Sequence, residues 1–76
     1  MMLTRYHLEL LDRDIDLRER AARVGLPLIA VSRAVRGTRS WPRPPTPAFL
    51  DSAEHVIEER ERVVLADLLE LHWERG

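Results

Sequence analysis

The residues of this chain best suited to chemistry are its arginines, which are concentrated in its middle. All twelve basic residues are arginine, and a guanidinium is a permanently charged, planar group that suits phosphate and guanine. Residues 17–43 hold seven arginines and one acid, a net charge of +6, whereas residues 1–16 carry −2 and residues 44–76 carry −5. A basic middle between acidic ends predicts a local anion-binding face.

Patterns for catalysis and metal binding are incomplete. Aspartates spaced by two over residues 12–16 imitate the start of a calcium-binding EF-hand loop, but Leu17 stands where that loop needs glycine and Arg23 where it needs glutamate. Ser32 has no histidine placed by the sequence to activate it, and there is no glycine-rich phosphate loop. We therefore expect neither an enzyme nor a bound metal or cofactor.

Length and composition limit the class of protein. The 76 residues suffice for one domain, residues 1–76, with a small core that a dimer or a partner surface would help. The absence of cysteine excludes disulfides and fits a reducing cytoplasm. No apolar run approaches the roughly 18–20 residues that span a bilayer, and the first residues lack the features of a signal peptide. We expect a soluble, cytoplasmic protein.

The spacing of apolar residues predicts two helices in the first third of the chain. Leucines at helical spacing predict a helix over residues 3–13. Asp16 followed three residues later by Glu19 resembles a capping box, which predicts a second helix over residues 17–24. Gly25 then suits the left-handed conformation that ends such a helix.

Prolines and glycines mark the ends of the following elements. Pro27 suits the first turn of a third helix over residues 27–35, and Gly37 ends it. Residues 38–45 contain three prolines and predict a loop. Thr46 followed by a proline is a helix start, with the threonine as cap.

The C-terminal part, residues 46–76, is acidic and helical. No glycine or proline interrupts residues 48–75, which predicts either one helix of about 30 residues or two helices with a break near residues 58–62. An apolar stripe with a spacing of seven is formed by Leu50, Ile57, Val64 and Leu71. With the helices and loop of residues 1–45, the prediction is an all-α fold of four or five helices.

The middle of the chain has the pattern of a helix-turn-helix. Ala21 is small enough to let two helices pack closely, Gly25 makes the turn, and Val31 fixes the second helix onto the first. LRERAARVGLPLIAVSRAVRG resembles the helix-turn-helix of Cro/repressor-like (XRE-type) regulators of bacteria, phages and mobile elements. Ser32, Arg33 and the glycine at 37 match a frequent ending of the family's recognition helix, and TRSWPRPPTPAFLDSAEHVI matches its loop and next helix.

The resemblance, which covers residues 15–57, implies a repressor-like transcriptional regulator that binds a palindromic operator as a homodimer. Arg33 is the expected guanine contact, beside an outward-facing Ser32, and Arg36 is expected at a base or a phosphate. Polar residues of the following loop are expected at phosphates. The predicted DNA-binding residues are Leu28, Ser32, Arg33, Arg36, Thr38, Arg39, Ser40 and Arg43.

Leu28, Ile29 and Ala30 depart from this pattern, because the family usually carries Ser, Thr, Gln or Arg there. Apolar side chains can touch thymine methyls, but they can also face another protein. The alternative is therefore a protein-interaction module that uses the helix-turn-helix as a scaffold. Such a module would be an antitoxin or a phage-encoded inhibitor of a host defence complex, with a host protein as partner.

Two features of the sequence each allow two interpretations. Trp41 either folds back as a lid on the core or stacks on DNA. The apolar residues of the C-terminal part either fill the core or form a dimer interface. The predicted interface residues are Leu50, Ile57, Val64, Leu68, Leu71 and Trp73.

Overall fold

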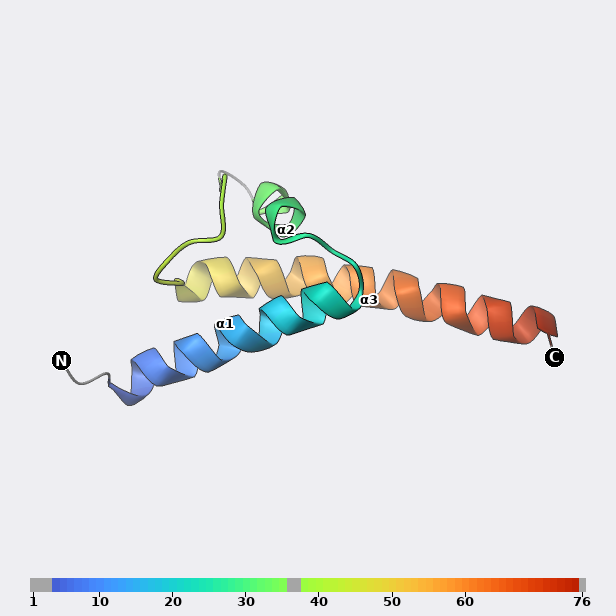
Figure 1. Cartoon of the computed structure of the whole chain (residues 1–76), viewed down its shortest axis with the longest axis horizontal. Helices are drawn as coiled ribbons and strands as arrows, with labels where there is room; N and C mark the ends of the chain where they lie inside the picture. The colour runs from blue at the N-terminus through green and yellow to red at the C-terminus, as the bar shows by residue number, and fades with distance from the viewer. Residues whose placement is uncertain (1–3, 36–37, 76) are drawn as a thin grey trace.

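The computed structural model describes residues 4–35 and 38–75, and its regular elements there are all α-helices. α1 (Arg5–Arg23) and α2 (Leu28–Ala34) are followed by a long α3 (Pro47–Arg75). Both shorter helices pack against α3, whose C-terminal half extends beyond them (Figure 1). The expected all-α class is confirmed, with three helices in the described residues instead of four or five.

α1 is one continuous helix where the sequence predicted two. It begins after Thr4, whose Oγ1 accepts a hydrogen bond from the backbone N–H of His7 at 3.2 Å. Asp16, expected to cap a second helix, lies inside α1 with a carboxylate oxygen 3.8 Å from the Arg20 guanidinium one turn later. The predicted break was wrong because no glycine or proline interrupts this segment and arginines four residues on compensate its aspartates.

The turn between α1 and α2 follows the prediction. Gly25 has φ +66°, the left-handed conformation that closes a helix without a Cβ clash. The N–H of Leu26 donates to the carbonyl of Ala21 at 2.9 Å, which satisfies one of the last acceptors of α1. Pro27 is the N-cap of α2, one position before the site expected for it. Gly37, expected to end this helix, lies outside the described residues.

α3 is a single helix of 29 residues, so of the two alternatives the continuous helix is correct. Thr46 caps it as predicted, because its Oγ1 accepts a hydrogen bond from the N–H of Phe49 at 3.2 Å. Pro47 occupies the first helical position, where no backbone N–H is needed.

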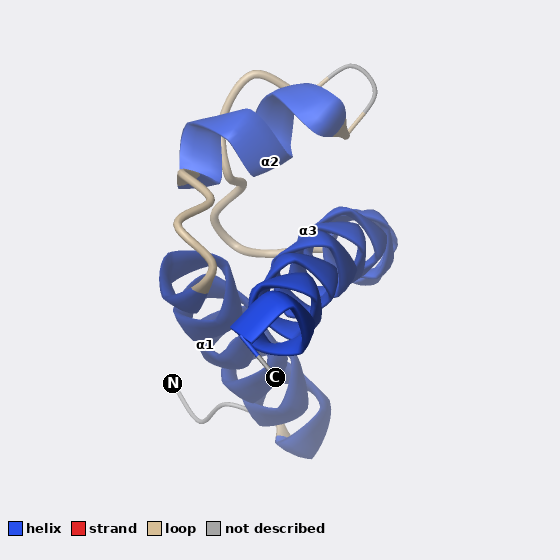
Figure 2. Cartoon of the chain, turned by 90° about the vertical axis from the view of Figure 1, so that its right-hand side faces the viewer, coloured by secondary structure: helices blue, strands red, loops and turns tan. Residues whose placement is uncertain are grey.

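One hydrophobic core joins the three helices. α1 and α2 lie on different flanks of α3 (Figure 2), and their apolar side chains meet those of its N-terminal half. The buried apolar residues are Leu17, Ala21, Val31, Phe49, Leu50, Ala53 and Ile57. In the described part of the chain this core stops at Ile57, which leaves the rest of α3 outside it.

Candidate nucleic-acid interface

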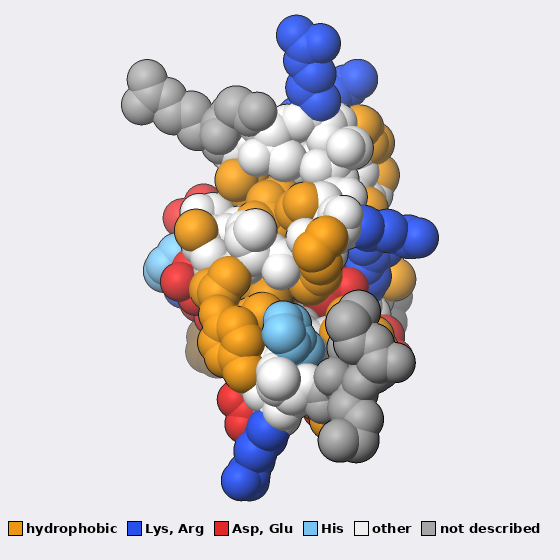
Figure 3. Space-filling view, turned by 90° about the vertical axis from the view of Figure 1, so that its left-hand side faces the viewer, with side chains coloured by type: hydrophobic (Ala, Val, Ile, Leu, Met, Phe, Trp, Pro, Cys, Tyr) orange, Lys and Arg blue, Asp and Glu red, His pale blue; other side chains and the backbone are white. Residues whose placement is uncertain are grey.

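Exposed arginines extend from α2 and from the loop that follows it. Arg33 on α2 is exposed, as are Arg39, Ser40 and Arg43 in the loop, while Thr38 is half-buried. Arginine side chains project from the end of the molecule that carries α2 and this loop (Figure 3). Within the described ranges none of these three arginines forms an ion pair.

Two predicted contact residues of α2 face inward instead. Ser32 is fully buried, and its Oγ donates a hydrogen bond to the carbonyl of Leu28 at 2.9 Å. Leu28 is half-buried against the core. The prediction of an outward-facing Ser32 was wrong because the helix face that buries Val31 and Leu28 includes position 32 as well.

The solvent face of α2 is therefore mainly apolar. Ile29 is 47% exposed, Ala30 is half-buried, and Arg33 is the polar residue on this face within Leu28–Ala34. Arg36, the other predicted base contact, lies outside the described residues. Of the apolar residues that depart from the family pattern, Leu28 thus packs against the core and Ile29 lies on the surface.

The arginines on the inner side of α1 are paired with acids of α3. Arg20 holds Glu61 with two hydrogen bonds, from Nε to Oε2 at 3.1 Å and from Nη2 to Oε1 at 2.6 Å. Arg13 lies 2.7 Å from Asp51 and 3.2 Å from Glu54. Within the described residues, Arg20 is therefore the arginine of the basic middle that pairs with acids of the C-terminal part, while Arg13 comes from residues 1–16.

These pairs change the acidity of both partners. The hydrogen bonds from Arg20 lower the pKa of Glu61 below its ordinary value of 4.5, and they raise the pKa of Arg20. The hydrogen bond to Asp51 likewise raises the pKa of Arg13. Because these guanidiniums bind carboxylates of α3, they are less available to bind an external anion.

Trp41 ties the basic loop to α1. Its Nε1 donates a hydrogen bond to the buried carboxylate of Asp14, which also accepts one from Arg18 Nε at 3.0 Å. The indole ring meets Phe49 edge-to-face at 5.0 Å, and the Arg18 guanidinium lies 4.9 Å from the ring centroid. The interpretation of Trp41 as a lid on the core is confirmed, and its N–H and ring are already engaged.

The role of Asp14 was missed by the sequence interpretation, which left this acid between two predicted helices. One signal was present, because Arg18 stands four residues later, at the spacing of a helical ion pair. The partner that matters for the loop, Trp41, is 27 residues away. No local spacing encodes such a contact.

The predicted dimer interface splits into two groups. Leu50 and Ile57 are 0% exposed within the monomer's own core, so their assignment to a dimer interface was wrong. α1 and α2 cover the apolar stripe of α3 at these positions. Val64 is half-buried, and Leu68, Leu71 and Trp73 are exposed.

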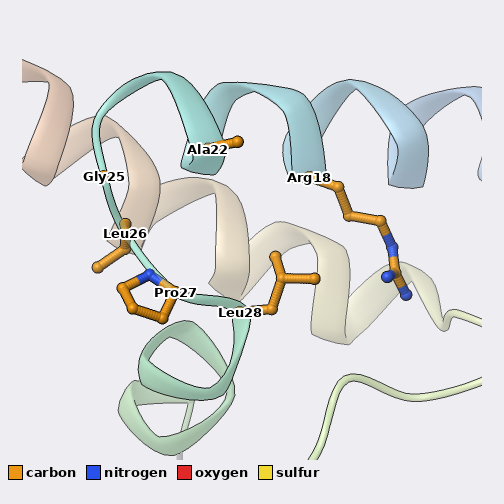
Figure 4. Close-up of a pocket in the computed structure, with 6 residues that line it drawn as sticks. All are labelled: Arg18, Ala22, Gly25, Leu26, Pro27 and Leu28. Atoms are coloured by element: carbon orange, nitrogen blue, oxygen red, sulfur yellow. The ribbon is translucent and has the colours of Figure 1, made fainter.

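A shallow, mainly apolar concavity of about 380 Å³ lies between the end of α1 and the start of α2 (Figure 4). Its lining residues are Arg18, Ala22, Gly25, Leu26, Pro27 and Leu28. In the described ranges no three His, Asp or Glu side chains are grouped so that they could share a metal ion. Among the same residues, no helix combines the length and the apolar character needed to cross a bilayer.

Comparison with protein families, with curated proteins and with solved structures found no match to this chain. The resemblance to Cro/repressor-like regulators therefore stays a prediction, and the function has to be argued from the side chains described above.

Proposed function

We propose that this chain is a small DNA-binding regulator that holds double-stranded DNA with the arginines of α2 and of the following loop. The observation that carries the proposal is the division among the arginines. Arg13 and Arg20 are bound to acids of α3, whereas Arg33 on α2 and Arg39 and Arg43 in the loop are exposed, with Arg43 at the end of the loop that lies near α1. Permanently charged guanidiniums that form no ion pair among the described residues suit a phosphate backbone.

The connection of α1 to α2 supports a helix-turn-helix. Ala21 and Val31 are both 0% exposed in one core, and Gly25 makes a left-handed turn between them. Helix-turn-helix motifs likewise join their two helices through a glycine turn, and here α3 holds both helices in place. In this proposal α2 approaches the major groove, and the loop held by Trp41 lies along the phosphates.

The side chains exposed on α2 could contact only a few bases. Arg33 can donate two hydrogen bonds to one guanine, and Ile29 can touch a thymine methyl group. Ser32 makes its hydrogen bond inside the protein and is left out of the proposed contact. We therefore propose phosphate-dominated binding with modest sequence preference.

The test is a fluorescence-anisotropy titration of labelled duplexes over a salt series. The double variant Arg39→Ala/Arg43→Ala should weaken binding to all duplexes alike and lower the slope of log K against log salt by about 2. Arg33→Ala should cost about 1–3 kcal/mol on preferred duplexes and less on the others.

The matched control is Arg5→Ala, which removes an arginine with a 94% exposed side chain on α1. Its affinity should stay within about twofold of wild type, because an exposed side chain outside the interface contributes little. No binding of wild-type protein to any duplex at low salt would contradict the proposal, and so would an equal loss in Arg5→Ala and Arg33→Ala.

A protein-interaction module is the second candidate, and the exposure of Ile29 favours it. Ile29 lies on the α2 surface beside the arginine expected to read a base. Ile29→Asp would abolish binding to an apolar protein surface. For DNA, the same change should act mainly by adding one negative charge, so that raised salt reduces its effect.

A further inference from the structure

A groove lies between α1 and the end of the loop that precedes α3. Two concavities of about 170 Å³ and about 370 Å³ both have Leu11, Pro44 and Pro45 in their walls, so they adjoin one another. Together they extend along α1 from His7 to Arg18, with residues 43–45 of the loop on the other side. We name this surface the α1 groove.

The two ends of the α1 groove differ in polarity. The end at His7 is lined mainly by leucine and proline. The other end carries the guanidiniums of Arg18 and Arg43 together with the carboxylate of Asp14. A groove that is apolar along its length and charged at one end suits a ligand with an apolar chain and a charged head.

The charged end contains a guanidinium that is already held in place. Arg18 donates from Nε to Oδ2 of Asp14 at 3.0 Å, and its guanidinium lies 4.9 Å from the centroid of the Trp41 ring. Its side chain extends along α1 toward the N-terminal end of the helix (Figure 4). Within residues 4–35 and 38–75 its two terminal nitrogens have no hydrogen-bond partner. Because the group is fixed, binding an anion there costs little side-chain entropy.

The charges at this end select a ligand with one negative charge. Both carboxylate oxygens of Asp14 already accept hydrogen bonds, one from Trp41 and one from Arg18. The two positive charges of Arg18 and Arg43 and the one negative charge of Asp14 leave a net charge of +1. A single carboxylate neutralises this charge, whereas a phosphate monoester would leave an excess of negative charge.

We propose that the α1 groove binds a monocarboxylate with an unbranched aliphatic chain of medium length, as in a medium-chain fatty acid. The carboxylate accepts hydrogen bonds from the terminal nitrogens of Arg18 and lies near Arg43. Its chain runs over Leu11 toward His7. The helix rises about 10 Å from residue 14 to residue 7, which matches a chain of about eight to ten carbons.

One consequence rests on the proposed DNA function, although the binding itself does not. Arg43 is one of the arginines proposed to hold phosphates, and it also lines the α1 groove. A bound carboxylate should therefore weaken DNA binding by competing for this side chain. Octanoate should lower the affinity for duplexes more than butyrate does at the same concentration and ionic strength.

The binding is tested by titrating the full chain with sodium octanoate, without DNA and at constant ionic strength, and recording ¹H–¹⁵N correlation spectra. The chain has two tryptophans, whose indole N–H signals report on two places. The signal of Trp41, which donates to Asp14 at the charged end, should shift and saturate with a Kd on the order of 1 mM. The signal of Trp73, which is 85% exposed near the end of α3, should stay in place.

Two further ligands test the proposed head and chain. Butyrate keeps the carboxylate but lacks four methylene groups, so it should bind at least about 10-fold more weakly. 1-Octanol keeps the chain but has no charge, so it should bind at least about 5-fold more weakly. Equal affinities for octanoate and 1-octanol would overturn the role of the two guanidiniums.

Matched variants test the apolar wall. Leu11→Ser changes a wall residue that is 38% exposed, and Leu8→Ser makes the same change at a 49% exposed position of α1 outside the groove. Far-UV circular dichroism should show that both variants are folded. Leu11→Ser should bind octanoate at least about 5-fold more weakly, whereas Leu8→Ser should stay within about twofold of wild type.

A second pair of variants tests the charged end. Arg43→Gln removes a guanidinium of the groove, and Arg23→Gln removes one near the end of α1, away from it. Octanoate should bind Arg43→Gln at least about 3-fold more weakly and Arg23→Gln within about twofold of wild type. Equal losses in the two variants would overturn the assigned position of the carboxylate.

Three outcomes of the titration overturn the proposal or its consequence. The absence of a saturating shift of Trp41 at about 20 mM octanoate would overturn the binding, given the affinity expected for a ligand of this size. Equal shifts of Trp41 and Trp73 would do so as well, because they would show general adsorption to exposed apolar side chains. If octanoate binds but no duplex does, the proposed function fails and the α1 groove stands. If octanoate binds and DNA affinity is unchanged, the competition fails alone.

Discussion

The two halves of α3 belong to one helix, but the apolar side chains of the first half are buried and those of the second half are exposed. In the first half Leu50, Ala53 and Ile57 are completely buried, whereas Leu65 and Leu69 in the second half are 57% and 60% exposed. The exposed half is the one richer in large apolar residues. Burial along this helix therefore follows the neighbours that α1 and α2 provide, and the hydrophobicity of a segment does not determine it.

The largest expected effect contrasts one apolar residue from each half. Ile57→Ala should destabilise the protein by about 2–5 kcal/mol, because it leaves a cavity in a closed core. Leu65→Ala should change the free energy of unfolding by less than about 0.5 kcal/mol in dilute monomer, because the side chain is already exposed. Urea denaturation at low micromolar concentration measures both, and similar losses would contradict the difference between the halves.

A second prediction concerns the attachment of the basic loop to α1. Asp14→Ala removes the acceptor of Trp41 and Arg18 and should cost about 1–3 kcal/mol. In a Trp73→Phe background, the emission of Trp41 should also shift to the red as the indole becomes hydrated. Asp12→Ala, an exposed acid of the same helix, is the control and should leave both readings unchanged.

A smaller effect is expected from the ion pair that joins the first half of α3 to α1. Glu61→Gln keeps the shape of the side chain but removes its charge, and about 1 kcal/mol of stability should be lost because the pair is partly exposed. Glu70→Gln in the exposed C-terminal half of α3 should have no measurable effect on the stability of the monomer. Equal effects of the two changes on the free energy of unfolding would show that the pairing of Glu61 with Arg20 does not stabilise the protein.

The same pair predicts how stability depends on pH. Because folding lowers the pKa of Glu61, its contribution is present above the ordinary value of 4.5 and is lost as the pH falls through the lower, folded value. Thermal unfolding of wild type should therefore show a fall in Tm below about pH 4.5. The fall should be shallower in Glu61→Gln, and identical profiles would contradict the prediction.

The smallest effect on stability is expected at the proposed DNA contact. Arg33→Ala should change the free energy of unfolding by less than about 0.5 kcal/mol, since the side chain is exposed and unpaired in the described part of the chain. Thermal or urea unfolding measures this change. A large loss would mean that Arg33 supports the fold, and a change in DNA affinity could then no longer be assigned to contact.

Local signals predicted the ends of elements well. Gly25 and Thr46 act through the backbone conformation and the hydrogen bonds of their immediate neighbours, so their effects can be read from a few residues. The continuity of α1 was missed because Asp16 fits a helix cap and a helix interior equally well. Ser32 was assigned to the wrong face because the family pattern was followed where the packing of α2 differs.

The sequence by itself determined an all-α chain, the turn at Gly25, the capped start of α3 and a cluster of arginines in the middle. The tertiary structure decided which of those arginines are neutralised and which part of the apolar stripe is covered. Arg20 and Glu61 are 41 residues apart, and Asp14 and Trp41 are 27 apart. Burial and ion pairing are properties of two segments brought together, and the spacing within one segment does not contain them.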